Sequence, residues 1–217
     1  ATGVPLARIA AMVALGEKLS SINIPERQDE AVCVKAPVFP FIKLRGLDPA
    51  PGPEMKSTGE VMGSHERASA AYLKARLATE SPVPTEGGVY ITVKDADKDS
   101  IIAQAKSLIE LGFKIYATRG TASVLREKGG LDVETCYRIT EGLTPDALDL
   151  MRQGKIHLII NTPRNTGGAV LDGNMMRRLA VELNIPFVTT MAGARMEVLA
   201  IAAVSYTHLR AHETQSD

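Results

Sequence analysis

The chain has 217 residues, with 25 Lys and Arg against 25 Asp and Glu, and 45% of its residues are hydrophobic. The zero formal net charge disfavours a nucleic-acid or acidic-membrane partner, and no apolar run approaches the roughly 20 residues that a transmembrane helix needs. The two cysteines, Cys33 and Cys136, both lie in β-like stretches, so we expect free thiols in a reduced, cytoplasmic protein.

The first third of the chain has little regular patterning. An amphipathic helix is predicted from Pro5 to about Leu19, a β-like run over residues 30–36, and a second helix over residues 65–78. Residues 37–64 between them are rich in Pro and Gly, which indicates a docking loop or part of a larger domain. Two prolines and a Gly pair in residues 79–88 predict a boundary that separates residues 1–83 from a second domain, residues 84–204.

The second domain alternates strand-like and helix-like segments. Strands are predicted at 89–93, 113–117, 133–137, 156–160 and 187–189, and helices at 98–111, 120–128, 145–152, 173–183 and 191–204. Asp97 is expected to be the N-cap of the first of these helices and Gly112 to end it. The alternation predicts an α/β domain with a five-stranded, mainly parallel sheet and helices on both faces.

Residues 205–217 show neither helical nor strand periodicity, and we expect them to form a disordered tail. They resemble translated sequencing-adapter sequence, so we interpret them as an artefact.

Two loops that follow predicted strands carry the groups that suit a phosphate. Thr118, Gly120 and Thr121 lie between a strand and a helix, where hydroxyls and unpaired helix N–H groups can donate to phosphate oxygens. Asn161 and Thr162 end another strand. Because ligands bind at the carboxyl ends of parallel strands, both loops together indicate a site for a small phosphorylated ligand.

Other chemistry is not supported by the sequence. It contains no complete Walker loop and no metal-ligand spacing around its histidines, so we expect no metal or catalytic site in this chain. His157 is interpreted as a structural histidine, Asp172 as the N-cap of the following helix, and Asp95, Asp97 and Asp99 as a solvated helix start.

Three stretches resemble the large subunit of the carbamoyl phosphate synthetase family. They are residues 1–11 (ATGVPLARIAA), 38–41 (VFPF) and 52–63 (GPEMKSTGEVMG), in the order and spacing found near the end of the second ATP-grasp half. The resemblance covers residues 1–204. It implies that residues 1–83 are the end of an ATP-grasp domain, and that residues 84–204 are a regulatory domain of methylglyoxal-synthase-like fold.

The resemblance implies a parent ligase that makes carbamoyl phosphate from bicarbonate, glutamine-derived ammonia and ATP for arginine and pyrimidine synthesis. ATP, Mg²⁺ and optionally K⁺ serve the parent, whose partners are the rest of the large subunit and a glutaminase subunit in an oligomer. The family's magnesium and ATP ligands lie upstream of this chain, so we expect no cofactor and no synthesis here.

The resemblance also implies that this piece binds a nucleoside monophosphate effector such as UMP or IMP. The positions that match the family's effector site, Arg138 standing where the family has Lys and Pro163 where it has Thr, are Lys98, Thr118, Gly120, Thr121, Arg138, Asn161, Thr162 and Pro163. Two cations and several donors suit a phosphate dianion.

A second effector site, for ornithine, is implied only in part. Thr189 matches the family, but Ala36 replaces a glutamate and Val188 an acidic residue, so an ammonium group would lack its partner. Two alternatives to a regulatory module stay open. One is a lyase of the methylglyoxal synthase type, although the loop from Asn161 to Gly168 contains no acid to act as base. The other is a structural or oligomerising domain with a vestigial pocket.

Overall fold

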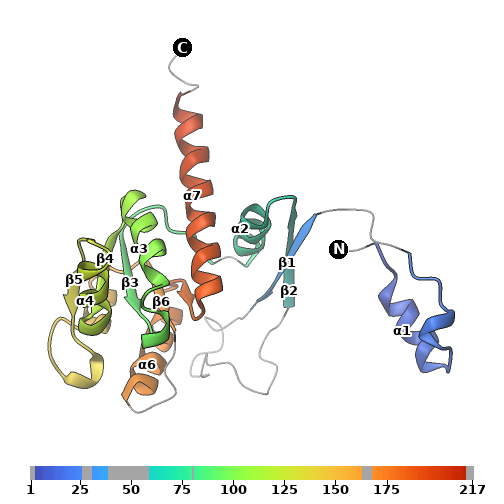
Figure 1. Cartoon of the computed structure of the whole chain (residues 1–217), viewed down its shortest axis with the longest axis horizontal. Coiled ribbons are helices and arrows are strands. Elements are labelled where there is room, and N and C mark those ends of the chain that lie inside the picture. Colours follow the sequence, from blue (N-terminus) through green and yellow to red (C-terminus); the bar gives the residue numbers. More distant parts are fainter. Residues whose placement is uncertain (1–2, 26–30, 39–58, 80, 163–167, 214–217) are drawn as a thin grey trace.

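The computed structural model describes residues 3–25, 31–38, 59–79, 81–162 and 168–213, the last eight of them as backbone only. A five-stranded sheet flanked by helices forms its main body, and a smaller antiparallel pair of strands lies beside it (Figure 1). In the described part of the chain, no helix is long and apolar enough to cross a membrane.

The main sheet is parallel throughout, with the strand order β5-β4-β3-β6-β7. β3 is thus central with β4 and β6 beside it, and between β5 and β6 the chain passes from one edge of the sheet to the other side of β3. The prediction of a five-stranded, mainly parallel sheet is confirmed. The strands are β3 (Gly88–Thr92), β4 (Lys114–Thr118), β5 (Glu134–Cys136), β6 (Leu158–Asn161) and β7 (Phe187–Val188).

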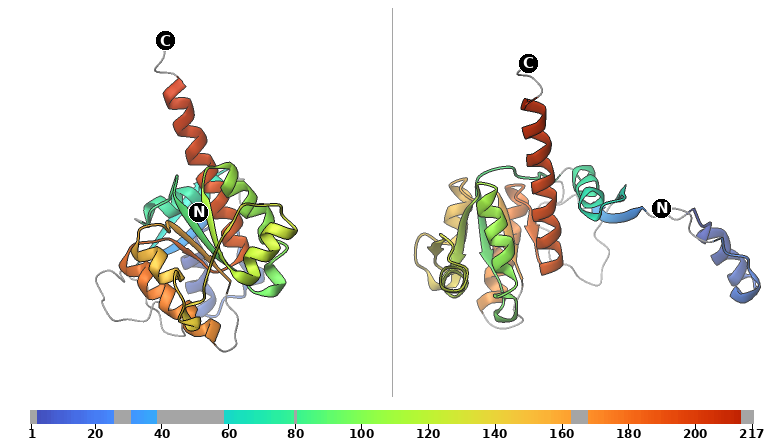
Figure 2. Two further views of the ribbon diagram at one scale, coloured as in Figure 1. Left: turned by 90° about the vertical axis from the view of Figure 1, so that its left-hand side faces the viewer. Right: turned by 45° about the horizontal axis from the view of Figure 1, so that its top comes forward.

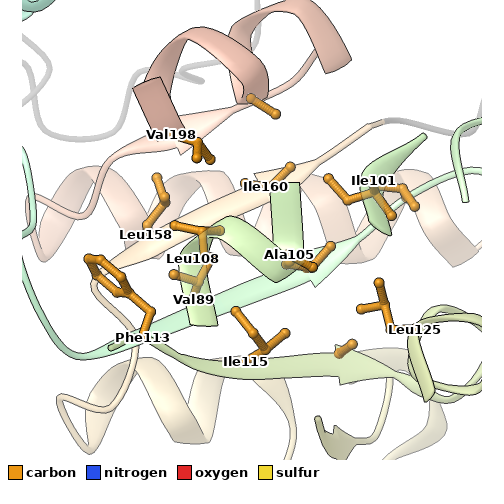
Figure 3. Packing of buried hydrophobic residues seen from close by; sticks show 14 of the residues in the cluster. Val89, Ile101, Ala105, Leu108, Phe113, Ile115, Leu125, Leu158, Ile160 and Val198 are labelled. Atoms are coloured by element: carbon orange, nitrogen blue, oxygen red, sulfur yellow. The ribbon is translucent and has the colours of Figure 1, made fainter. Parts of the chain in front are cut away.

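Helices cover both faces of this sheet and bury a separate core on each (Figure 2). Successive side chains of a strand point to opposite faces, so Val89 and Ile91 belong to one core and Tyr90 to the other. The first core lies under α3, α4 and α7, and Figure 3 shows Val89 and Leu158 packed beside Leu108 and Val198. The second lies under α5 and α6. The helices are α3 (Ile101–Glu110), α4 (Arg119–Glu127), α5 (Ala147–Arg152), α6 (Gly168–Glu182) and α7 (Met191–Glu213).

The N-terminal part contains α1 (Leu6–Ala14), a two-stranded antiparallel sheet of β1 (Val32–Val38) and β2 (Gly59–His65), and α2 (Ala68–Ala78). β2 was not predicted, because its glycines and polar residues hide any alternation and its pairing with β1 is non-local. α2 packs closely on β2 at Gly63, where an added Cβ would lie 2.0 Å from the Ala71 carbonyl oxygen. Only a residue without a side chain permits this approach.

Of the two predictions about the ends of α3, one was wrong and one was confirmed. A 3₁₀ turn, η2 (Asp95–Asp97), precedes α3, whose N-cap is Ser100 without a side-chain bond. Asp97 therefore caps nothing there and pairs with Lys94 at 3.8 Å. Gly112 does follow the end of α3, with φ of 89°.

The tail also differs from its prediction, because α7 continues through residues 205–213 as far as Glu213. Adding residues to an existing helix costs far less than nucleating one, so a segment without an apolar stripe can extend it.

Candidate functional site

A cavity of about 170 Å³ opens at the carboxyl ends of β3, β4 and β6. Parallel strands bring their ends to one edge, so Thr92, Thr118 and Asn161 meet there although they are far apart in sequence. The lining residues come from these strand ends, from η2 and the residues around it, from the segment after β5, from the first turn of α4, and from the second and third turns of α6. They are Tyr90, Thr92, Val93, Lys94, Asp95, Lys98, Thr118, Gly120, Thr121, Arg138, Asn161, Thr162, Asp172 and Met176.

The N-terminus of α4 forms one wall. Thr118 is its N-cap with extended backbone and no side-chain capping bond, so the first N–H groups of the helix have no capping acceptor. Gly120 leaves room for Lys98, whose Nζ would lie 3.0 Å from a Cβ at this position. A helix N-terminus beside a cation is a favourable place for an anion.

Hydrogen bonds between the loops hold the opposite wall in place. The Lys94 N–H donates to Thr162 Oγ1 at 3.0 Å, and the Thr162 N–H donates to the Thr92 carbonyl at 3.2 Å. Thr92 Oγ1 and Thr118 Oγ1 lie 3.3 Å apart. Asn161 is 7% exposed, and its Oδ1 is buried without a hydrogen-bond partner. A hydrogen bond from a ligand or a water molecule to this buried oxygen would therefore be favourable.

Cations and carboxylates are paired around the cavity. Lys98 Nζ lies 2.8 Å from Asp95 Oδ1. Arg138 is close enough to Asp172 to lower the pKa of its carboxyl group, which counteracts part of the larger effect of burial. An incoming phosphate would therefore exchange with existing carboxylate partners of these cations.

Asp172 is the main site residue that the sequence analysis placed wrongly. It does not cap a helix, because α6 begins at Gly168 and Asp172 lies inside its second turn. The side chain is buried, and Thr140 donates to Oδ1 through its N–H at 3.0 Å and to Oδ2 through its hydroxyl at 3.3 Å. Burial raises the pKa of Asp172 above its ordinary value, although the Thr140 hydrogen bonds oppose the shift.

The predicted phosphate ligands largely converge. Seven of them line the same cavity: Lys98, Thr118, Gly120, Thr121, Arg138, Asn161 and Thr162. Pro163 lies outside the described residues, and Thr189 is exposed and does not line the cavity. Thr92 and Lys94 were missed, although Thr92 lies near the end of the predicted strand 89–93 and Lys94 directly follows it. Asp95, which was interpreted as part of a solvated helix start, also lines the cavity.

The interpretations of two other side chains are confirmed. His157 has a structural contact, because the Gly88 N–H donates to its Nδ1 at 3.2 Å. Cys136 is a buried free thiol, and burial raises its pKa to about 12. Within the described ranges, no group of three or more His, Cys, Asp and Glu side chains could hold a metal ion.

Comparison with known proteins gives two consistent results. Residues 100–189 match the family described as MGS-like domain. The chain is 48% identical over 205 residues to the carbamoyl phosphate synthase large chain of Methanothermobacter thermautotrophicus, covering 94% of this chain and 19% of that protein. It is 46% identical to the carbamoyl phosphate synthase large chain, C-terminal section, of Methanocaldococcus jannaschii, covering 93% of this chain and 34% of that protein.

A bacterial relative, the carbamoyl phosphate synthase large chain of Acidobacterium capsulatum, is 43% identical over 99% of this chain and 20% of its own length. The chain therefore spans between a fifth and about a third of these relatives. Among solved structures, methylglyoxal synthase from Elizabethkingia anophelis matches with a TM-score of 0.44 and 18% identity, over 54% of this chain and 79% of that one.

Proposed function

We propose that this chain is part of a carbamoyl phosphate synthase large chain and that its MGS-like domain binds a nucleoside monophosphate effector such as UMP or IMP. The observation that carries the proposal is the convergence of Lys98, Arg138 and the N-terminus of α4 on one cavity with the hydroxyls of Thr118 and Thr121. These groups match the charge and the acceptor geometry of a phosphate.

The parent protein, in this proposal, is a glutamine-dependent ligase of arginine and pyrimidine synthesis in the cytoplasm. It uses ATP, bicarbonate, Mg²⁺ and ammonia from a glutaminase subunit, and the domain in this chain regulates it. The chain spans only part of its relatives, and no complete active site is expected in it. We predict no carbamoyl phosphate from the purified chain supplied with ATP, bicarbonate and ammonia; measurable turnover would contradict the proposal.

Ornithine is not expected to act on this chain. Ala36 on β1 replaces a glutamate and supplies no negative charge. The exposed Thr189 lies between β7 and α7, next to Val188, which is also uncharged. An ammonium group needs a charge partner when it leaves water. Titration with ornithine should therefore give no heat, and saturable binding would contradict this reading.

Lyase activity of the methylglyoxal synthase type is the second candidate, because Asp172 puts a carboxyl group in the cavity. A general base must be ionised and able to reach the substrate. Both oxygens of Asp172 already accept hydrogen bonds from Thr140, so the carboxyl group is held by the protein and not directed at a substrate. We therefore rank binding above catalysis. Formation of methylglyoxal from dihydroxyacetone phosphate, lost in Asp172→Asn, would reverse the ranking.

Calorimetric titration of the whole chain with UMP, IMP and inorganic phosphate tests the proposal. Thr118→Ala and Lys98→Ala should each weaken binding about tenfold or more, since a hydrogen bond to a charged group contributes about 1.5–3 kcal/mol. Lys106→Ala is the matched control, because Lys106 lies exposed on α3 and does not line the cavity. If no ligand binds, the domain is a structural module with a vestigial pocket.

A further inference from the structure

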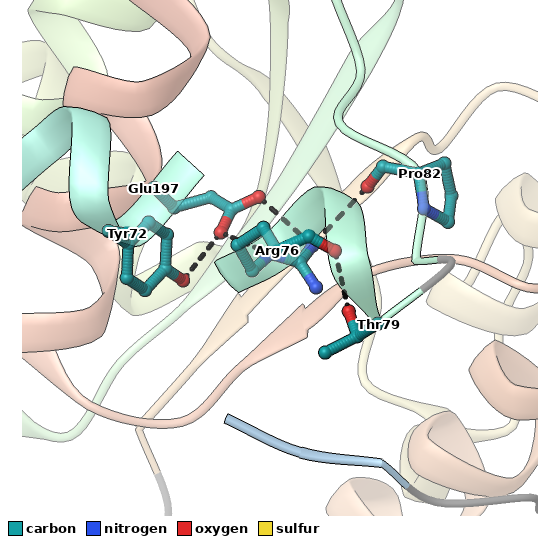
Figure 4. A network of polar contacts seen from close by, with 5 residues as sticks. All are labelled: Tyr72, Arg76, Thr79, Pro82 and Glu197. Carbon is teal, nitrogen blue, oxygen red and sulfur yellow. Dashed lines mark hydrogen bonds and ion pairs between the residues drawn. The ribbon is translucent and has the colours of Figure 1, made fainter. Parts of the chain in front are cut away.

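A fully buried carboxylate lies between the two parts of the chain. Glu197 of α7 is 0% exposed, and its two donors in Figure 4 come from α2. The Tyr72 hydroxyl donates to Oε2 at 2.7 Å. Arg76 donates through Nε to Oε2 at 3.0 Å and through Nη2 to Oε1 at 3.1 Å, which makes the ion pair bidentate.

The same arginine also binds the connection between the two parts. Its Nη2 donates to the Pro82 carbonyl at 3.3 Å, and its own carbonyl accepts from the Thr79 hydroxyl at 2.7 Å (Figure 4). One side chain therefore joins α2, the linker after it, and α7.

The geometry of the pair leaves little freedom between the helices. A buried carboxylate is costly unless it is paired and hydrogen-bonded, and a bidentate pair fixes both distance and orientation. α2 and α7 pack directly against each other. On α7, Val198 and Ile201 belong to the core of the main sheet, so Glu197 is anchored to that core.

On its other side, α2 is anchored to the small sheet. Gly63 of β2 lies directly against the α2 backbone, and Lys74 Nζ donates to the Ser64 carbonyl at 2.9 Å. A displacement of α2 would therefore carry β2, and β1 paired with it, along with it.

We propose that Tyr72, Arg76 and Glu197 form an interdomain latch that joins the β1–β2–α2 unit to the MGS-like domain as one rigid body. The rigid unit then begins at Gly59 of β2, upstream of the boundary that the sequence predicts at residue 84. A movement of α7 is therefore transmitted through α2 to the small sheet. The linker alone does not set the orientation of the β1–β2–α2 unit relative to the MGS-like domain. This inference is independent of the proposed effector.

Distance measurement between two spin labels in the full chain tests the latch. Met62→Cys on β2 and Lys106→Cys on α3, both exposed, carry the labels in a Cys33→Ser background. Cys136 can stay, since its thiol is buried with a pKa of about 12 and resists labelling at neutral pH. The latched protein should give one narrow distance distribution.

Arg76→Met should broaden this distribution at least twofold, while cooperative unfolding of the main sheet persists. Lys74→Met is the matched control on the same helix: it removes a contact within the small unit and should leave the distribution narrow. Equal breadth in the two variants, or an unchanged distribution in Arg76→Met, would overturn the proposal.

Two further variants separate the charge pair from simple packing and guard against misfolding. The double substitution Arg76→Met with Glu197→Leu replaces the buried ion pair with two apolar side chains that can pack but form no directional bonds. The distance distribution should then stay broad. A narrow distribution would show that packing alone sets the orientation of the two parts. If Arg76→Met does not fold, Tyr72→Phe removes a single hydrogen bond and should broaden the distribution to a smaller extent. No broadening in a folded Tyr72→Phe protein would then count against the latch.

Discussion

Gly120→Ala offers a test that separates ligand binding from folding. Gly120 is the second residue of α4 and has no positive φ, so alanine fits the backbone there. The new Cβ would lie 3.0 Å from Lys98 Nζ and 3.9 Å from its Cε. That is too close to an ammonium group, but the group ends a flexible side chain and can move away. The substitution should therefore displace the cation without disturbing the helix.

The magnitude follows from the interaction that is displaced. A hydrogen bond to a charged group contributes about 1.5–3 kcal/mol, and each 1.4 kcal/mol corresponds to tenfold in affinity. Lys98 can recover part of the contact by bending, so we expect phosphate and UMP to bind about tenfold more weakly. Stability should hold or rise by up to about 1 kcal/mol, because alanine is the better helix former.

Calorimetric titration and thermal unfolding of the same preparations give both quantities. Gly59→Ala is the matched control, since a Cβ at Gly59 meets nothing within 4 Å. An affinity within twofold of the parent sequence in folded Gly120→Ala would refute the role of Lys98 as a ligand. A large loss of stability would refute the steric reasoning itself.

Three further outcomes are expected. The pKa of Asp172 is raised in the folded state by burial, so the folded protein should lose stability as pH rises from about the ordinary value of 3.8 through the folded pKa. Asp172→Asn should remove this slope in urea unfolding curves recorded across that range, and an unchanged slope would assign it to another group. Cys136 should resist thiol reagents at pH 8 until the protein is denatured, because its pKa is about 12; rapid modification of both cysteines in the native state would contradict the burial. Gly63→Ala should destabilise the chain by about 1–3 kcal/mol through overpacking, since its Cβ would lie 2.0 Å from the Ala71 carbonyl; unfolding as stable as that of Gly59→Ala would show that α2 can shift.

Most of the cavity could be predicted because parallel strands end together. The runs before Thr118 and Asn161 are apolar and compact, so they are recognisable as buried strands from sequence. Once both are strands of one parallel sheet, the side chains that follow must meet at one edge. The strand pattern does not predict that Lys98 and Arg138 lie at the cavity. Only the resemblance to a known family indicated these two residues.

The errors arose where the decisive contact is non-local. Nothing near Asp172 in sequence shows that Thr140 will donate to it twice, and a carboxylate near a helix start is usually a cap. In the same way, Glu197 looks like one charge on an apolar helix until Arg76 and Tyr72 of α2 are placed against it. Local sequence patterns predict helices and strands, whereas contacts between residues that are distant in sequence are known only once the helices and strands are packed together.

The carboxyl group of Asp172 bears directly on whether the cavity senses or catalyses. Its pKa is already raised by burial in the free protein, and a phosphate dianion entering the same cavity would raise it further, since like charges disfavour ionisation. In a sensor, Asp172 is free to take up a proton as the anion binds and then to donate a hydrogen bond to it. A base must instead remain ionised while the phosphorylated substrate is bound. Arg138 opposes the shift, but its effect on Asp172 is smaller than that of burial. The number of protons taken up on binding is therefore the quantity that most directly separates the two functions: uptake of a proton supports an anion sensor, and no uptake supports a base.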